Sequence, residues 1–275
     1  MARQETIAAP SEIAAFGRGG FYGRHRARIR GAATFLYLIL FWEIAARYIV
    51  RDERILAPFV KVAAALAKLF TTGEIWKHLA VSGYEFAAGF ALAALAGVAL
   101  GFLMGTVRAA REYLDPWVAA LYSAPLVALA PLYIMFFGVG LAAKVALVFS
   151  VAVFPIAVNT FAGVYSVNPG LIEVARSFNA TRAQVLFKVL VPYALSYVVT
   201  GLRLGVGRGL TGVVVGEFFF ANAGLGFLVA LAGQTFNTPL LFAGILVFAV
   251  SGVALTGGLK RLERKLAPWR DFENE

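Results

Sequence analysis

Long apolar runs, separated by short polar or basic stretches, cover most of this chain. A helix needs about 20 consecutive apolar residues to cross the hydrocarbon core of a bilayer, and six runs approach that length. The pattern therefore predicts an all-α fold, a polytopic transmembrane bundle of about six helices. The predicted spans cover residues 32–50, 81–106, 116–137, 141–165, 193–220 and 239–258.

One polar stretch, residues 168–192, lies between the fourth and fifth apolar runs and has the signals of two short helices. Asn168 is a favourable N-cap, and Pro169 fits the first helical position, where a missing N–H costs little. Asn179 can end this first helix, because asparagine tolerates the left-handed conformation better than most residues other than glycine. The stretch is therefore predicted to be structured.

The second half of the stretch predicts another short helix with one apolar face. Thr181 and Gln184 have the spacing of a capping box, and Pro192 is expected to end the helix. Four apolar residues fall on one side of it: Val185, Leu186, Val189 and Leu190. We expect this apolar face to dock onto a partner in the cytoplasm.

Small residues recur every fourth position along two of the predicted spans. Such a stripe lets helix backbones approach closely, so it predicts tight packing and does not indicate a ligand. Within the third span, Pro125 and Pro131 each remove a backbone hydrogen bond and predict a bent or broken helix. The glycines that we assign to packing are Gly97, Gly101, Gly105, Gly201, Gly205 and Gly209.

The composition agrees with a membrane protein, since 60% of the residues are hydrophobic and only 15% are charged. The net charge of +10 comes from basic residues that cluster beside the apolar runs. This placement indicates anchoring on an anionic membrane surface and not nucleic-acid binding. The segments placed inside hold 16 Lys and Arg and those placed outside hold 5, so both termini are predicted to be cytoplasmic.

Three parts of the chain follow from this pattern. Residues 1–31 form a basic, partly disordered arm without the features of a cleaved signal peptide. Residues 32–262 form the transmembrane domain, in which residues 51–80 include an interfacial helix. Residues 263–275 form a cytoplasmic tail.

Sequence motifs of several enzyme classes are absent. The chain has no P-loop, so it is not expected to hydrolyse ATP by itself. It also lacks the H-E-x-x-H and G-x-S-x-G motifs. With no cysteine and only two histidines, a thiolate or histidine-rich metal site is not expected. We therefore predict a protein that is not an enzyme and that has no catalytic residue or cofactor of its own.

Charged residues inside the spans are costly, and each one raises the question of a functional site. Arg203 and Arg208 lie in the inner half of the fifth span and Glu217 in its outer half. They either pair with other helices or contact headgroups, or they line a water-filled translocation pathway that favours an anionic solute. Four other charges are interpreted as structural: Glu43, Arg47, Glu85 and Lys144.

The polar stretch 168–192 resembles the EAA loop of ATP-binding-cassette importer permeases. Glu173-Val174-Ala175 stands for the Glu-Ala-Ala of that family, and residues 189–192 stand for its hydrophobic ending with proline. Asn179 departs from the family pattern, which has glycine there. Further segments resemble the nitrate, sulfonate and taurine subfamily: 114–116, 125–131, 154–160 and 200–217.

This resemblance implies a permease subunit of the bacterial inner membrane that imports a small anionic solute. A second permease copy, two cytoplasmic ATPase subunits that bind ATP and Mg²⁺, and a periplasmic or lipid-anchored solute-binding protein would be its partners. The loop would transmit force from the ATPase. The residues to which the resemblance gives this coupling role are Glu173, Ala175, Asn179, Thr181, Gln184, Val185, Val189 and Pro192.

Three alternatives stay open at this point. The same machinery would also suit a heterocyclic vitamin precursor as its solute. A self-sufficient secondary transporter would use Glu43, Glu85 or Glu217 as a proton relay, although no inverted repeat of broken spans is evident. A membrane scaffold without solute flux is the third possibility. The sequence does not identify the solute.

Overall fold

A computed structural model describes residues 21–266, and this part of the chain is almost entirely helical, without strands. Five of its helices are long and apolar enough to cross a membrane, or six if one sharply bent helix pair counts as a single span. The predicted all-α membrane class is confirmed. The chain divides into two compact units, residues 1–61 and 62–275.

The first unit is built around one long helix. Helix α1 (Phe21–Ile44) continues into the π-helical segment η2 (Ala45–Val50), and its apolar part, Ala33–Val50, matches the first predicted span. The segment ends at Arg51, whose φ of 57° is left-handed. Residues 21–31 of the predicted arm are thus helical, and residues 1–20 lie outside the described part.

Polar contacts fold the chain after η2 back onto its helix. The predicted pair is present, with Arg47 Nη2 lying 2.5 Å from Glu43 Oε1. Glu43 also accepts a hydrogen bond from the Val60 backbone N–H at 3.3 Å. The indole N–H of Trp42 donates to the carbonyl of Ala57 at 2.9 Å. These bonds fix the start of α2 (Phe59–Thr72), the helix predicted within residues 51–80.

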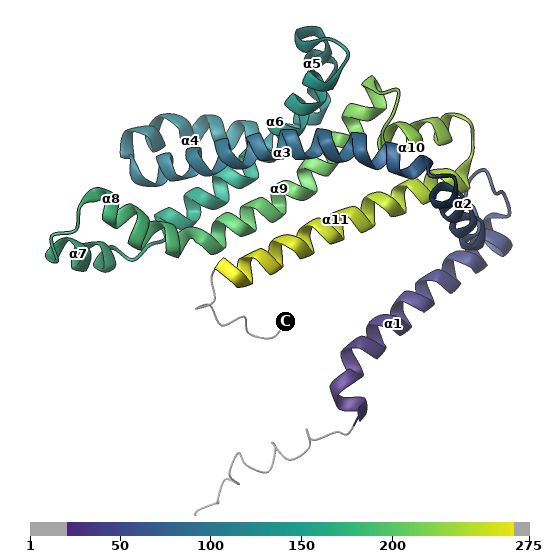
Figure 1. Ribbon diagram of the computed structural model, residues 1–275, viewed down its shortest axis with the longest axis horizontal. Coiled ribbons are helices and arrows are strands. Elements are labelled where there is room, and N and C mark those ends of the chain that lie inside the picture. Colours follow the sequence, from purple (N-terminus) through teal and green to yellow (C-terminus); the bar gives the residue numbers. More distant parts are fainter. Residues whose placement is uncertain (1–20, 267–275) are drawn as a thin grey trace, which may run out of the picture. The chain divides into compact units, whose positions relative to one another are not determined.

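The second unit contains the remaining helices, drawn in Figure 1. Its spans lie close to the predicted ones, and α6 has the predicted bounds. The elements are α3 (Glu74–Thr106), α4 (Arg108–Ser123), η3 (Leu126–Leu129), α5 (Ala130–Phe137), α6 (Leu141–Tyr165), α7 (Pro169–Ser177), α8 (Arg182–Val185), η4 (Leu186–Leu190), α9 (Val191–Phe220), α10 (Leu225–Gln234) and α11 (Thr238–Leu266).

Helices α3, α6 and α9 form the core of this unit, with α6 packed between the other two. The glycine stripes face these contacts. A Cβ atom added at Gly97 would lie 2.8 Å from the carbonyl oxygen of Val153, and one at Gly201 would lie 3.1 Å from that of Ile156. Side chains larger than hydrogen would push the helices apart. Both stripes therefore serve packing within one chain. Gly101, Gly105, Gly205 and Gly209 have similarly close neighbours.

The third span is broken, as its prolines predict. Helix α4 and the segment η3–α5 meet at an angle of 82°. Ala124, directly before Pro125, has the extended conformation that a following proline imposes (φ −71°, ψ 143°). Pro131 lies in the first turn of α5, where its missing N–H costs little.

The prediction that Pro192 ends a helix is wrong. Residues Arg182–Phe219 pass through α8, η4 and α9 as one apolar helical run. Pro192 lies in the first turn of α9, where the hydrogen-bond ladder does not require its N–H. The π-helical turn of η4 directly before it changes the hydrogen-bond register of the helix.

Candidate functional site

The stretch from Asn168 to Pro192, which we call the coupling loop after its predicted role, has the predicted caps at Asn168 and Asn179. The Asn168 side chain accepts a hydrogen bond from the Gly170 N–H at 2.9 Å and caps α7. Asn179 is left-handed, with φ 57°, and the next N–H, of Ala180, donates to the Ala175 carbonyl at 3.1 Å. Asparagine thus takes the conformation that glycine would adopt most easily.

The capping box at the start of α8 is also present. The Thr181 N–H donates to Gln184 Oε1 at 2.8 Å, and the Gln184 N–H donates to Thr181 Oγ1 at 3.3 Å. Together with Asn179, this pair of bonds fixes the turn between α7 and α8. The role of the three residues in coupling stays a prediction, but their role in shaping the loop follows from these contacts.

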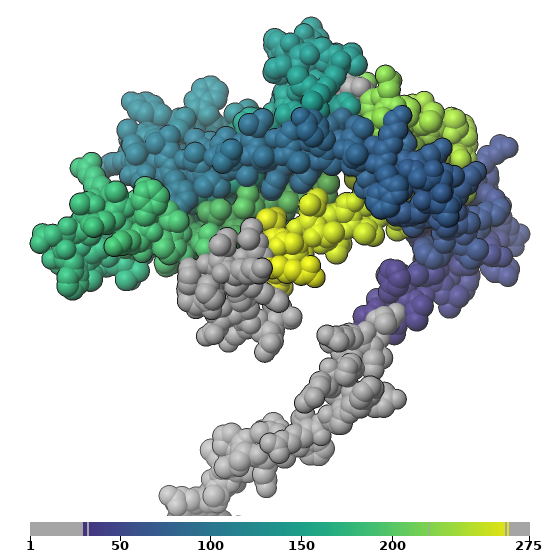
Figure 2. Space-filling view, in the orientation of Figure 1, coloured from purple at the N-terminus to yellow at the C-terminus, as the bar shows by residue number. Residues whose placement is uncertain are grey.

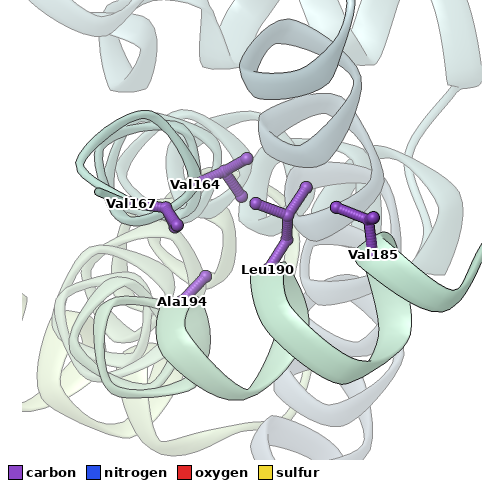
Figure 3. Packing of buried hydrophobic residues seen from close by; sticks show 5 residues of the cluster. All are labelled: Val164, Val167, Val185, Leu190 and Ala194. Atoms are coloured by element: carbon purple, nitrogen blue, oxygen red, sulfur yellow. The ribbon is translucent and has the colours of Figure 1, made fainter. Parts of the chain in front are cut away.

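The apolar face of the second helix packs inward, contrary to our prediction that it docks on a partner. Val185 and Leu190 are buried in a cluster with three residues of the bundle, Val164, Val167 and Ala194 (Figure 3). Leu186, Val189 and Ala175 pack against the same cluster. Removing this apolar surface from water or headgroups is favourable, so the face holds the coupling loop on the bundle.

A different apolar face of the coupling loop is exposed. Leu171, Val174 and Phe178 are spaced i, i+3 and i+7, so they share one side of α7, and they are 48%, 56% and 83% exposed. Glu173 is exposed on the same helix. Figure 2 shows this loop in green at one end of the second unit. Our sequence analysis missed this stripe, although the spacing of its residues is visible in the sequence.

Two arginines of the coupling loop line an open cavity of about 500 Å³ beside the end of α3. Arg176 and Arg182 face it together with apolar residues such as Val107 and Leu186. Neither arginine forms an ion pair with another described residue. The coupling loop therefore carries two positive charges, at Arg176 and Arg182, that no described carboxylate compensates.

A buried polar cluster joins α3 to the first turn of α10. Ser82 Oγ donates to Glu217 Oε1 at 2.5 Å and accepts from the Leu225 N–H at 2.8 Å. Glu217 also accepts from the Gly226 N–H. Its side chain is only 1% exposed, so it contacts no space open to a solute. These contacts favour the structural interpretation of Glu217 over a place on the translocation pathway.

Next to this cluster, Lys144 of α6 and Glu85 of α3 form a buried ion pair, with Nζ 2.6 Å from Oε1. Their side chains are 8% and 3% exposed, which agrees with the structural role that we assigned to them. A buried pair of this kind contributes little net stability, but removing one partner leaves an uncompensated charge.

We expect Lys144→Met to lower the free energy of unfolding by about 3–5 kcal/mol, since it leaves the Glu85 carboxylate buried without its cation. The double variant Glu85→Gln with Lys144→Met removes both charges and should recover most of the loss. Thermal unfolding of the purified proteins in one detergent measures both. A double variant as unstable as the single one would show that the ion pair is not the cause.

The two arginines of α9 have different surroundings. Arg203 Nη2 lies 2.9 Å from Glu263 Oε2 of α11, and Glu263 is buried. Arg208 is exposed and has no ion-pair partner among residues 21–266. A place on the translocation pathway stays a prediction for both, and the geometry favours it for Arg208. Within the described residues, no group of three His, Cys, Asp or Glu is arranged to hold a metal.

Comparison with known proteins identifies the family. Residues 94–268 match the model of the binding-protein-dependent transport system inner membrane component. A Bacillus subtilis permease protein named for aliphatic sulfonates transport is 35% identical, with 88% of each chain covered. The formylaminopyrimidine transport permease protein of Halalkalibacterium halodurans is 33% identical, with 86% of this chain and 94% of that protein covered.

The fold is also found among solved structures. The methionine ABC transporter MetNI, solved in inward-facing conformations, contains a chain that matches with a TM-score of 0.56 and 21% identity. The match covers 71% of the present chain and 95% of that chain. From the fold, the sequence relatives and the family match together, we conclude that this chain belongs to the binding-protein-dependent inner membrane components and is an ABC-importer permease, not an enzyme.

Proposed function

We propose that the coupling loop of this permease is its contact with a cytoplasmic ATPase, and that the exposed stripe Leu171, Val174 and Phe178 is the centre of that contact. The family implies an ATPase and a solute-binding protein as partners. The observation that carries the proposal is the division of the loop into two apolar faces. One face is buried on the bundle, and the other lies exposed at the loop surface.

A loop fixed in this way can transmit force. Its inner face binds α6 and the start of α9 through Val164, Val167 and Ala194, and its turn is fixed by the capping box. A displacement of α7 by a partner would therefore move the spans as a rigid body, as alternating access requires. Arg176 and Arg182 would add attraction to acidic groups around the apolar contact.

The complete assembly that we propose has two copies of this permease, two ATPase subunits that bind ATP and Mg²⁺, and one solute-binding protein on the outer side. Both termini would be cytoplasmic, since the positive-inside rule places them there. In this orientation the coupling loop and the ATPase share one side of the membrane. ATP hydrolysis would belong to the partner, because this chain has no P-loop.

For the solute we propose a small organic anion of the sulfonate or taurine kind, which the relative named for aliphatic sulfonates supports. A second candidate is a pyrimidine vitamin precursor, because the formylaminopyrimidine permease is nearly as similar and is covered almost completely.

The test is ATP hydrolysis by the purified permease–ATPase complex in lipid nanodiscs with its solute-binding protein. We expect taurine or 1-butanesulfonate to stimulate hydrolysis, and formylaminopyrimidine to do so if the second candidate holds. Stimulation by no solute, together with uptake into vesicles driven by an ion gradient without the ATPase, would overturn the proposal in favour of a secondary transporter.

A further inference from the structure

Arg208 is the arginine of α9 whose charge has no counter-charge within the described residues. Counted along α9, it lies about 25 Å from the first residue and about 18 Å from the last, at 1.5 Å of rise per residue. Arg208 is therefore just past the middle of the helix, and not in the inner half that we predicted. A charge so far from either helix end is costly in a membrane unless water or an anion compensates it. The surroundings of Arg208 therefore bear on what passes through this protein.

Arg208 lines a small open cavity at the break of the third span. Pro125 lies at this break, and Tyr122 and Thr211 also line the cavity. The Thr211 hydroxyl donates to the carbonyl of Gly207 at 3.2 Å, so its lone pairs stay open to a further donor. The rest of the wall is apolar: Leu121, Ala124, Leu126, Val127, Val151 and Phe154. One cation and two hydroxyl-bearing residues in an apolar surround suit an acid headgroup attached to a short organic tail.

The size of the cavity narrows the kind of ligand. Its volume is about 90 Å³, and it is open on one side. A sulfonate or carboxylate headgroup is small enough to enter such a space. The guanidinium presents several N–H donors in a planar fork, which matches the oxygen atoms of such a headgroup.

We propose that Arg208, with Thr211 and Tyr122, forms an anion-recognition site at the break of the third span, which holds the acid headgroup of an organic anion during its passage. This inference rests on the proposed transport function. It adds that Arg208 selects solutes by their negative charge. Arg203 does not share this role, because Glu263 already compensates its charge.

The absence of cysteine in the chain permits a test that does not depend on transport. In a Thr211→Cys variant, within the permease–ATPase complex in phosphatidylcholine nanodiscs, the rates of modification by an anionic and a cationic methanethiosulfonate reagent are compared. The reagents carry a sulfonatoethyl and a trimethylammonioethyl group. Adding Arg208→Gln should lower the ratio of the anionic to the cationic modification rate about tenfold, because one nearby positive charge is lost. Adding Arg208→Lys keeps the positive charge and should leave this ratio unchanged.

The matched control is the double change Arg203→Gln with Glu263→Gln, which alters α9 one and a half turns away without changing the net charge. It should leave the rate ratio unchanged. A ratio insensitive to Arg208→Gln, or equally sensitive to the control, would overturn the inference.

Protection by a solute gives a second readout. With Arg208 present, 1-butanesulfonate should slow modification of Cys at position 211 by neutral methyl methanethiosulfonate, and 1-butanol should not. In the Arg208→Gln variant the protection should disappear. The assignment of the anion site would be overturned if protection survives this change. It would also be overturned if anionic lipid protects Cys at position 211 and 1-butanesulfonate does not. The modification assay needs no ATP, so it reports on the anion site even if the complex does not transport. If the proposed transport function is wrong, solute fails to stimulate ATP hydrolysis; if the anion site is wrong, the modification rates do not depend on Arg208.

Discussion

Changing Val174 and Phe178 together to aspartate is expected to abolish solute-stimulated ATP hydrolysis while the permease still inserts and folds. Val174 is exposed on α7 and Phe178 is exposed at its C-cap, so the change costs the isolated chain little. At the ATPase contact it would bury two carboxylates in place of apolar groups. Losing two central contacts of an interface typically costs several kcal/mol, so stimulated hydrolysis should fall by at least about 100-fold.

Two comparisons make this result specific. Phe178→Leu keeps an apolar side chain and should retain most of the stimulated rate. Val185→Asp instead places a charge in the cluster with Val164 and Leu190, so it should reduce the amount of folded protein and not only its coupling. Full stimulation of the Val174→Asp, Phe178→Asp variant, with the ATPase bound, would show that the stripe is not the contact.

Gly101→Ala is expected to destabilise the core strongly, although it adds only one methyl group. The new Cβ atom would lie 2.6 Å from the carbonyl oxygen of Ala157 and 2.5 Å from Cβ of Thr160. Neither atom can rotate away, because one is backbone and the other is the first atom of its side chain. Helices α3 and α6 would have to separate, at a cost of at least about 2 kcal/mol. The temperature of thermal unfolding in detergent measures the loss.

Gly83 supplies a control in the same helix. A Cβ atom there meets nothing within 4 Å, so Gly83→Ala should be neutral, or stabilise by up to about 1 kcal/mol through helix propensity. Equal unfolding temperatures for the two variants would show that close packing of α3 against α6 does not limit stability. Spectra that report helix content distinguish loss of packing from loss of secondary structure.

Most spans of this protein and the caps of its coupling loop could be predicted from the amino-acid sequence. The length of the apolar runs predicted the spans, because a bilayer has a fixed thickness. Asn168, Asn179 and the Thr181–Gln184 capping box act on backbone groups only a few residues away. Signals of such short range are readable from the sequence, and all three were confirmed.

The tertiary structure was needed to show which face of each helix packs against another part of the chain. The apolar residues around Val185 looked equally suited to an external partner, yet they pack on residues near Val164 of α6. Arg203 and Arg208 looked equivalent along α9, but among residues 21–266 only Arg203 has a carboxylate in reach, 60 residues away on α11. Burial and ion pairing depend on segments distant in the sequence, and the spacing of residues along one helix does not contain that information.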